Sequence, residues 1–261
     1  MPRTPPPAAN VPVARDAAAD SMRGPWVLPS AVARTVYRLT QAGVLELESD
    51  TLRSRDTLQV TIQAALARTG ARISGSLLAY DASLGGAAAA TGVMLPLAVA
   101  FRVDSLHRVT TTAPASGAPC ATPAAALAQP LRELVVAHPD TLRSGARWSD
   151  SALVMLCRDG IPLTVTIVRQ YQLEEARREA GLLVLRVRRR TRGSLVGEGA
   201  QFNEPVSLRG EIEGDATLRI SAASGALLSL EGESQLTMQL QGRLRTQRVR
   251  QRVALHAAVL P

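Results

Sequence analysis

The sequence predicts a mainly β protein, built from a long, curled antiparallel sheet or half-barrel with one short helix. Apolar and polar residues alternate over residues 208–220 and 228–240, a pattern typical of strands with one buried face. A strand of thirteen residues at about 3.3 Å each spans roughly 43 Å, and sheets this long are expected to coil. Glycines at the inward positions, where a bent strand has no room for a side chain, support the curvature: Gly210, Gly214 and Gly232.

The remaining elements follow from the same alternation and from turn signals. Strands are predicted at residues 34–40, 43–49, 56–67, 71–80, 97–103, 106–112, 151–157, 161–171, 181–190 and 247–259. The first two are expected to form a hairpin, and Asp159-Gly160 predicts a second hairpin turn. The Gly/Ala-rich residues 82–92 predict a loop. The helix is predicted over residues 124–137, where leucines recur at helical spacing and Pro130 lies in the first turns.

These elements predict a proline- and alanine-rich linker at residues 1–30 and a single β-rich domain at residues 31–261. The segments that begin Tyr37-Arg-Leu and Tyr171-Gln-Leu are alike. They raise the alternative of two similar halves, residues 31–112 and 151–261, joined by the connector with the helix.

Two cysteines, Cys120 and Cys157, are too far apart for a CxxC redox or zinc motif. We expect them to form one disulfide, which would close a loop of roughly 38 residues and contribute about 4 kcal/mol in the chain-entropy model. The alternative is two unrelated buried thiols.

The compartment is predicted to be periplasmic, outer-envelope or secreted. The Pro/Ala-rich start resembles a tether between a signal or lipid anchor and a folded domain, and a disulfide fits an oxidising compartment. However, residues 1–30 contain no apolar signal-peptide core. The sequence also contains no run of eighteen apolar residues, so no membrane-spanning helix is predicted. The alternative is a cytoplasmic protein with an irregular N-terminus.

Arginine supplies all 30 positive charges, and the formal net charge is +8. The codon bias of a GC-rich genome would explain this preference for arginine without any functional role for the charge. Two clusters on strand faces are nevertheless candidates for anion binding if their strands are neighbours: Arg186, Arg188 and Arg190, and Arg248, Arg250 and Arg252. These stretches lack the aromatic residues that stack on single-stranded nucleic acid, so a nucleic-acid partner is not expected.

No pattern in the sequence predicts an active site, a metal site or a cofactor. The histidines His107, His138 and His256 have no metal-ligand spacing, and no nucleophile elbow or phosphate-binding loop occurs. The carboxylates Glu211, Glu213 and Asp215 share one strand face, which is expected to be solvated rather than catalytic. The protein is therefore predicted not to be an enzyme.

The second half of the chain resembles an uncharacterised class of exported β-rich bacterial domains. The resemblance covers roughly residues 130–260 and depends on "LRSGARWSD", a following strand with "YQL", and the terminal hairpin "ISAASGALLSLEGES". It implies location and architecture, and no catalytic residues. Within it, Trp148 is expected to plug one end of the sheet, with a ligand contact as the alternative.

Two functional hypotheses are consistent with these observations. The first is a non-catalytic envelope or secreted domain that binds a hydrophobic or amphipathic ligand, such as a lipid, in its concave face. The second is a structural or interaction module whose arginine-rich outer face meets an acidic partner, such as an anionic envelope polymer. A transmembrane barrel is disfavoured because the chain has only three Tyr, two Trp and two Phe for aromatic girdles. The oligomeric state is left open.

Overall fold

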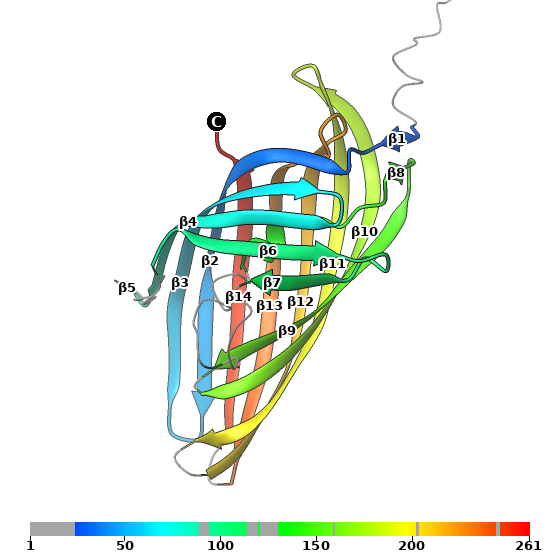
Figure 1. The fold of residues 1–261 in the computed structure, drawn as a ribbon. Coiled ribbons are helices and arrows are strands. Elements are labelled where there is room, and N and C mark those ends of the chain that lie inside the picture. Colours follow the sequence, from blue (N-terminus) through cyan, green and yellow to red (C-terminus); the bar gives the residue numbers. More distant parts are fainter. Residues whose placement is uncertain are drawn as a thin grey trace, which may run out of the picture.

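The computed structural model of the protein describes residues 24–88, 94–113, 120, 130–158, 160–201, 204–243 and 246–261. These residues form a nearly closed antiparallel barrel (Figure 1). Its elements are β1 (Trp26–Val27), β2 (Ala31–Ser49), β3 (Arg53–Thr69), β4 (Arg72–Leu84), β5 (Ala87–Ala88), β6 (Leu97–Val103), β7 (Val109–Ala113), the 3-10 helix η1 (Pro130–Leu134), β8 (Thr141–Leu142), β9 (Arg147–Arg158), β10 (Ile161–Glu179), β11 (Leu182–Gln201), β12 (Glu204–Ser221), β13 (Leu227–Gly242) and β14 (Thr246–Val259).

The main sheet follows the order β7-β6-β4-β3-β2-β14-β13-β12-β11-β10-β9, with β5 paired to β4. Each neighbouring pair is antiparallel, and the last strand of the chain, β14, pairs with β2. This pairing joins the two halves of the chain into one sheet. The short β1–β8 ribbon lies at one end of the barrel (Figure 1).

The two ends of the sheet meet at β7 and β9. The backbone N–H of Ser151 donates to the carbonyl of His107 at 3.3 Å, and Arg108 forms a parallel bridge with Ser151. The seam is parallel because the path contains eleven strands, so its first and last strands run in the same direction. Beyond Ser151, β9 has no second strand partner within the described part of the chain.

Alternate side chains of the long strands point into the barrel and form its core. Around η1, at the end that carries β1 and β8, the buried residues include Leu131, Leu134, Leu185, Leu218 and Leu230. A second cluster lies toward the other end and includes Leu163, Leu195, Leu208, Met238 and Val249. Each fully buried side chain of this size contributes about 1.5–3 kcal/mol.

The inward glycines lie where neighbouring strands approach closely, as the sequence predicts. A Cβ atom at Gly210 would lie 2.5 Å from the carbonyl oxygen of Thr237, and one at Gly214 would lie 2.8 Å from that of Glu233. A side chain at either position would force the strands apart, so these glycines permit the curvature of β12 and β13.

The long strands at the end of the chain confirm the predicted fold class, but several predicted details are wrong. Residues 34–49 form one continuous strand, β2, rather than a hairpin, because Ala42 and Gly43 stay paired with β14 on one side and β3 on the other. β4 runs on to Leu84 and a short β5 follows within the predicted loop at residues 82–92, of which residues 89–92 lie outside the described residues. Likewise, β11 continues well past residue 190.

The helix predicted over residues 124–137 is not an α-helix in its described part. Residues 124–129 lie outside the described residues, and from residue 130 onward only the 3-10 turn η1 is helical. Leu131, Leu134, Val135 and Ala137 are all buried inside the barrel. The segment is therefore in contact with the barrel on every side, whereas the predicted amphipathic helix would have only one buried face. These tertiary contacts outweigh the local helix propensity.

No helix in the described residues is long and apolar enough to cross a membrane. Most of the predicted linker, residues 1–23, lies outside the described part, as does Asp159 of the predicted turn.

Candidate functional site

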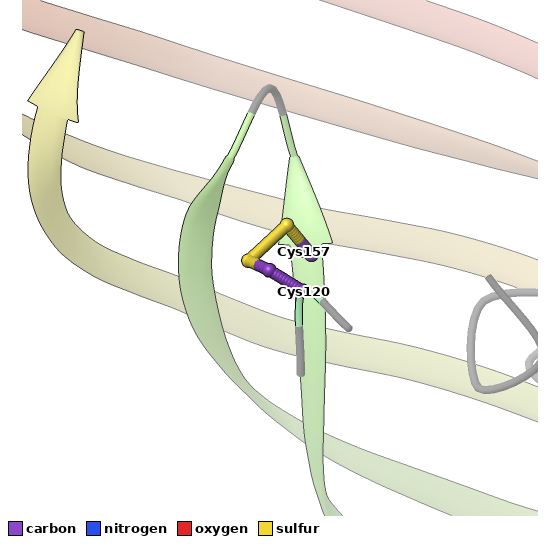
Figure 2. The surroundings of a disulfide bond; sticks show 2 residues. All are labelled: Cys120 and Cys157. Carbon is purple, nitrogen blue, oxygen red and sulfur yellow. A yellow bond between two sulfur atoms is a disulfide. The ribbon is translucent and has the colours of Figure 1, made fainter. Parts of the chain in front are cut away.

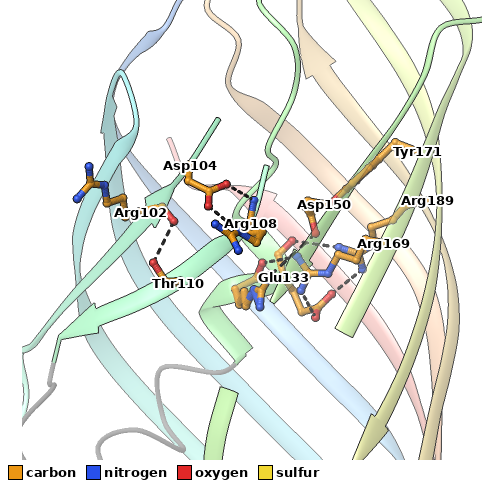
Figure 3. Close-up of polar contacts among 10 residues, drawn as sticks. Arg102, Asp104, Arg108, Thr110, Glu133, Asp150, Arg169, Tyr171 and Arg189 are labelled. Carbon is orange, nitrogen blue, oxygen red and sulfur yellow. Dashed lines mark hydrogen bonds and ion pairs between the residues drawn. The ribbon is translucent and has the colours of Figure 1, made fainter. Parts of the chain in front are cut away.

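The barrel interior holds a cluster of buried charges on η1, β9, β10 and β11. The alternation of β10 places Arg169 and Tyr171 inward, between Ile167 and Leu173. The sheet register sets Asp150 of β9 opposite Arg169, and Arg189 of β11 opposite Tyr171. Three strands thus present polar side chains to the same region, where η1 crosses the interior (Figure 3).

Glu133 of η1 bridges two of the buried arginines. An Nη2–H of Arg169 donates to Oε1 of Glu133 at 2.9 Å, and an Nη2–H of Arg189 donates to Oε2 at 2.5 Å. Arg169 also donates from Nη1 to the backbone carbonyl of Arg132 at 3.0 Å. These bonds attach η1 to the barrel wall (Figure 3).

A second acidic group, Asp150, completes the cluster. The hydroxyl of Tyr171 donates to Oδ2 of Asp150 at 2.7 Å, and Nη2 of Arg132 lies 3.9 Å from Oδ1. The ring of Trp148 stacks on Tyr171 with centroids 5.1 Å apart. Trp148 is thus buried against the charge cluster, and its contact with Tyr171 helps to orient the phenol.

The surroundings of Glu133 keep it ionised. Burial raises the pKa of this carboxyl, but the guanidinium groups of Arg169 and Arg189 outweigh that effect and lower the pKa to about 2. Burial and the nearby Arg169 lower the pKa of Arg132 to about 10, so Arg132 is still charged at neutral pH. The cluster therefore brings three arginines, Arg132, Arg169 and Arg189, together with two acidic residues, Glu133 and Asp150.

An interior cavity of about 460 Å³ begins beside this cluster. Glu133 and Arg189 line it on the side of η1, and Leu156 and Cys157 of β9 line it near the open part of the seam. Most of the other lining side chains are apolar and come from β10 to β14, among them Leu163, Val165, Ile212, Leu236, Met238 and Val253. The cavity therefore has largely apolar walls and a charged end beside η1, and its lining also includes Arg158 and Glu233.

Small residues leave this space unfilled. Across three strands, Thr191, Gly214 and Ser234 lie side by side in register, and all three line the cavity. Barrels with more than about eight strands have interiors too wide for side chains alone to fill, and they commonly enclose ligand cavities or channels. The small side chains enlarge the space that the strand number already provides.

The disulfide joins Cys120 to Cys157 (Figure 2), and Cys157 lines this cavity. The two Cα atoms lie 4.9 Å apart, and the cysteines are 37 positions apart in the sequence. Because Cys157 lies on the part of β9 beyond the seam, the bond ties the connector to the free edge of the sheet.

The two predicted anion-binding clusters lie on the outer face of the barrel, on strands that are not neighbours. β12 and β13 separate β11, which carries Arg186, Arg188 and Arg190, from β14, which carries Arg248, Arg250 and Arg252. The strands between them present exposed acidic residues: Glu211, Glu213, Asp215, Glu231 and Glu233. Anion binding by either cluster stays a prediction.

Carboxylates lie beside both arginine clusters, and those beside the β14 cluster form ion pairs with Arg53 and Arg55 of β3. Arg188 and Arg190 both approach Asp215, at 3.4 and 3.6 Å. On the other side, Arg248 and Arg250 are in register with Glu48 and Glu46 of β2. The outer face of these strands therefore has stripes of alternating charge.

The histidines do not form a site. His138 is buried beside Arg68, with 3.1 Å between Nε2 and Nη1, and burial together with that guanidinium lowers the pKa of His138 to about 4. Within the described residues, no group of three His, Cys, Asp or Glu side chains could hold a metal ion.

The interior charge cluster was not predicted from the sequence. Arg169 and Arg189 occupy inward positions, as Leu163, Val165 and Val187 do on the same strands. The signal in the sequence that could have predicted the cluster was an arginine at a position where the alternation of the strand calls for an apolar residue. Its partner Glu133 carried no such signal, because it lies on η1 and meets the strands only in the folded barrel.

No family model matches the chain, and no curated protein matches it. A crystal structure of Pseudomonas aeruginosa OccK2 (OpdF) in complex with glucuronate is similar at 9% identity, over 90% of this chain and 100% of that chain, with a TM-score of 0.21. At that TM-score the similarity supports no conclusion about function, which we therefore infer from the interior.

Proposed function

We propose that the protein is a non-catalytic domain of the cell envelope, or a secreted one, that binds a hydrophobic or amphipathic ligand inside its barrel. The cavity of about 460 Å³ carries this proposal. Its volume falls in the range of about 300–1,000 Å³ typical of small-molecule sites, and such sites combine apolar walls with a few polar groups.

The two parts of the cavity suit the two parts of an amphipathic molecule. An alkyl chain fits against Ile212, Leu236 and Met238, where burial contributes about 0.8 kcal/mol per methylene. A polar head fits beside Thr191 and Arg189 at the charged end. The disulfide supports the location, because disulfides persist in oxidising compartments.

A cavity-filling substitution tests the proposal. We expect Leu236→Trp to weaken binding of 1-dodecanol by about tenfold or more, because the indole occupies space that the alkyl chain needs. Binding is measured by displacement of the neutral dye Nile red, with thermal unfolding as a check of the fold.

Gln235→Trp is the matched control, since Gln235 is the exposed neighbour on the outer face of the same strand. It should bind 1-dodecanol as the unmodified protein does. Absence of dye uptake by the unmodified protein, or equal affinities for the Leu236→Trp and unmodified proteins, would contradict the proposal.

A further inference from the structure

The charged end of the cavity holds more buried arginines than acidic residues. Within the cluster beside η1, the side chains of Arg132, Arg169 and Arg189 are each at most 2% exposed, and the acidic residues that face them are Glu133 and Asp150. Three guanidinium groups thus share at most two carboxylates. Buried charges are stable when each has a counter-charge, so the cluster favours a further anionic group in its surroundings.

The same arginines also have hydrogen-bond donors without partners. Within the described residues, the Nε–H groups of all three have no hydrogen-bond partner, and neither do Nη1 and Nη2 of Arg132. A guanidinium carries five N–H donors and no acceptor, so only an acceptor can satisfy these groups. In an interior of low dielectric constant their positive charge also acts across several ångströms, which favours an anion nearby even without direct contact.

Arg189 connects this cluster to the cavity, because it is the one of the three arginines that lines it. Thr191 lies two positions further along the same inward face of β11. It lines the cavity as well and has a hydroxyl that can donate a hydrogen bond. A carboxylate beside these two residues would therefore have both a cation and a neutral donor as partners.

The apolar walls begin one row beyond this pair. Thr191 is in register with Gly214 of β12, and the next inward residue of β12, Ile212, is the register partner of Leu236 on β13. Met238 follows two positions further along β13. An alkyl chain that starts beside Thr191 can therefore extend along Ile212, Leu236 and Met238, which all line the cavity.

The acidic residues of the lining do not favour a cationic head group. Both carboxylate oxygens of Glu133 already accept hydrogen bonds from two of the buried arginines. Glu233 is exposed and is the register partner of Asp215 on the outer face of the barrel. Within the described residues no other acidic side chain lines the cavity, and the remaining charged residue of the lining, Arg158, is positive.

From this arrangement we propose that the ligand of the barrel is a single-chain amphiphile with a carboxylate head. The head lies beside Arg189 and Thr191, and the alkyl chain lies along the apolar rows of β12 and β13. This inference rests on the proposed ligand-binding function and adds the charge and the position of the head. Arg189 then determines the preference for an anionic head.

Ligands with the same alkyl chain and different heads test the charge on the unmodified protein. Dodecanoate, 1-dodecanol and dodecylammonium are compared at pH 7 and one salt concentration by displacement of Nile red. We expect dodecanoate to bind about tenfold or more tightly than 1-dodecanol, and dodecylammonium to bind most weakly, because only the carboxylate can pair with the arginines. Equal affinities for dodecanoate and 1-dodecanol, or tightest binding of dodecylammonium, would overturn the inference.

Substitutions at the charged end test the position of the head. Arg189→Gln should remove most of the advantage of dodecanoate over 1-dodecanol. The matched control Arg192→Gln removes a charge from the exposed outer face of the same strand and should keep the full advantage. A folded Arg189→Gln protein that keeps the advantage, or an Arg158→Gln protein that loses it instead, would overturn the assignment.

Thr191→Asp keeps the test decisive if Arg189→Gln does not fold, because it leaves the pairing of Arg189 with Glu133 in place. The new carboxylate takes the position proposed for the head of the ligand, so dodecanoate should lose its advantage over 1-dodecanol. Thermal unfolding checks the fold of each variant. A Thr191→Asp protein that still prefers dodecanoate would contradict the proposed position.

Binding of 1-dodecanol separates this inference from the proposed function. If none of the three ligands displaces the dye from the unmodified protein, the ligand-binding function is refuted. If 1-dodecanol and dodecanoate bind equally well, the ligand-binding function stands and the anionic head alone is refuted.

Discussion

Replacing Glu133 with Gln should lower the free energy of unfolding by about 3–5 kcal/mol, the range measured when one partner of a buried ion pair is removed. Glu133 is the carboxylate that binds both Arg169 and Arg189, and both guanidinium groups are almost fully buried. Without it, two positive charges stay in the interior with no direct counter-charge. Urea unfolding of the two proteins at pH 7 measures the difference.

Glu198→Gln serves as the control, since Glu198 is exposed on the outer face of β11. It should change the free energy of unfolding by no more than about 0.5 kcal/mol. A loss below about 1 kcal/mol for Glu133→Gln would contradict the assignment of Glu133 as the residue that holds η1 in the barrel.

The same carboxylate gives the stability a defined pH dependence. Its pKa falls from 4.5 in the unfolded chain to about 2 in the folded protein, so its contribution is complete above pH 4.5 and is lost as the pH falls toward 2. The lowered pKa corresponds to about 3 kcal/mol. Glu133→Gln should lack this part of the acid destabilisation.

Removing the disulfide is the second large effect. The double variant Cys120→Ser/Cys157→Ser should be about 2–4 kcal/mol less stable, because the bond spans 37 positions and restricts the unfolded chain. Without reductant, the native protein should show no thiol that reacts with a maleimide. Reduced unmodified protein should unfold at the same urea concentration as the double variant, and two reactive thiols in the native protein would contradict the bond.

The sequence predicted β12, β13 and β14 to within a few residues because their alternation is long, whereas β10 and β11 run well past their predicted ends. In β12 each inward apolar residue or glycine lies two positions from the next, and in β13 only Ser234 interrupts the same spacing, so a slip by one residue would expose the whole set. The hairpin predicted over residues 34–49 was wrong because a glycine in a strand marks either a turn or a close approach. The pairing of β14 with Gly43 shows that this glycine marks a close approach of two strands and not a turn, and the sequence alone does not show that pairing.

The interior site was beyond sequence reasoning for a physical reason. Which residues meet Glu133 depends on how η1 crosses the barrel, and that path depends on contacts between elements far apart in sequence. The β7–β9 seam is similar, since it joins the two ends of an eleven-strand path. Alternation predicts which face of a strand is buried, but it does not predict what lies across the interior.

Photolabelling tests the central claim, that the ligand lies inside the barrel, most directly. A long-chain alcohol with a diazirine at its alkyl end is incubated with the protein in solution, irradiated, and located by peptide mass spectrometry. Labels should fall on inward residues of β12 and β13, such as Ile212, Leu236 and Met238, and excess 1-dodecanol should suppress them. Labels confined to exposed residues such as Leu153, Met155 and Val196 would contradict a ligand-binding interior.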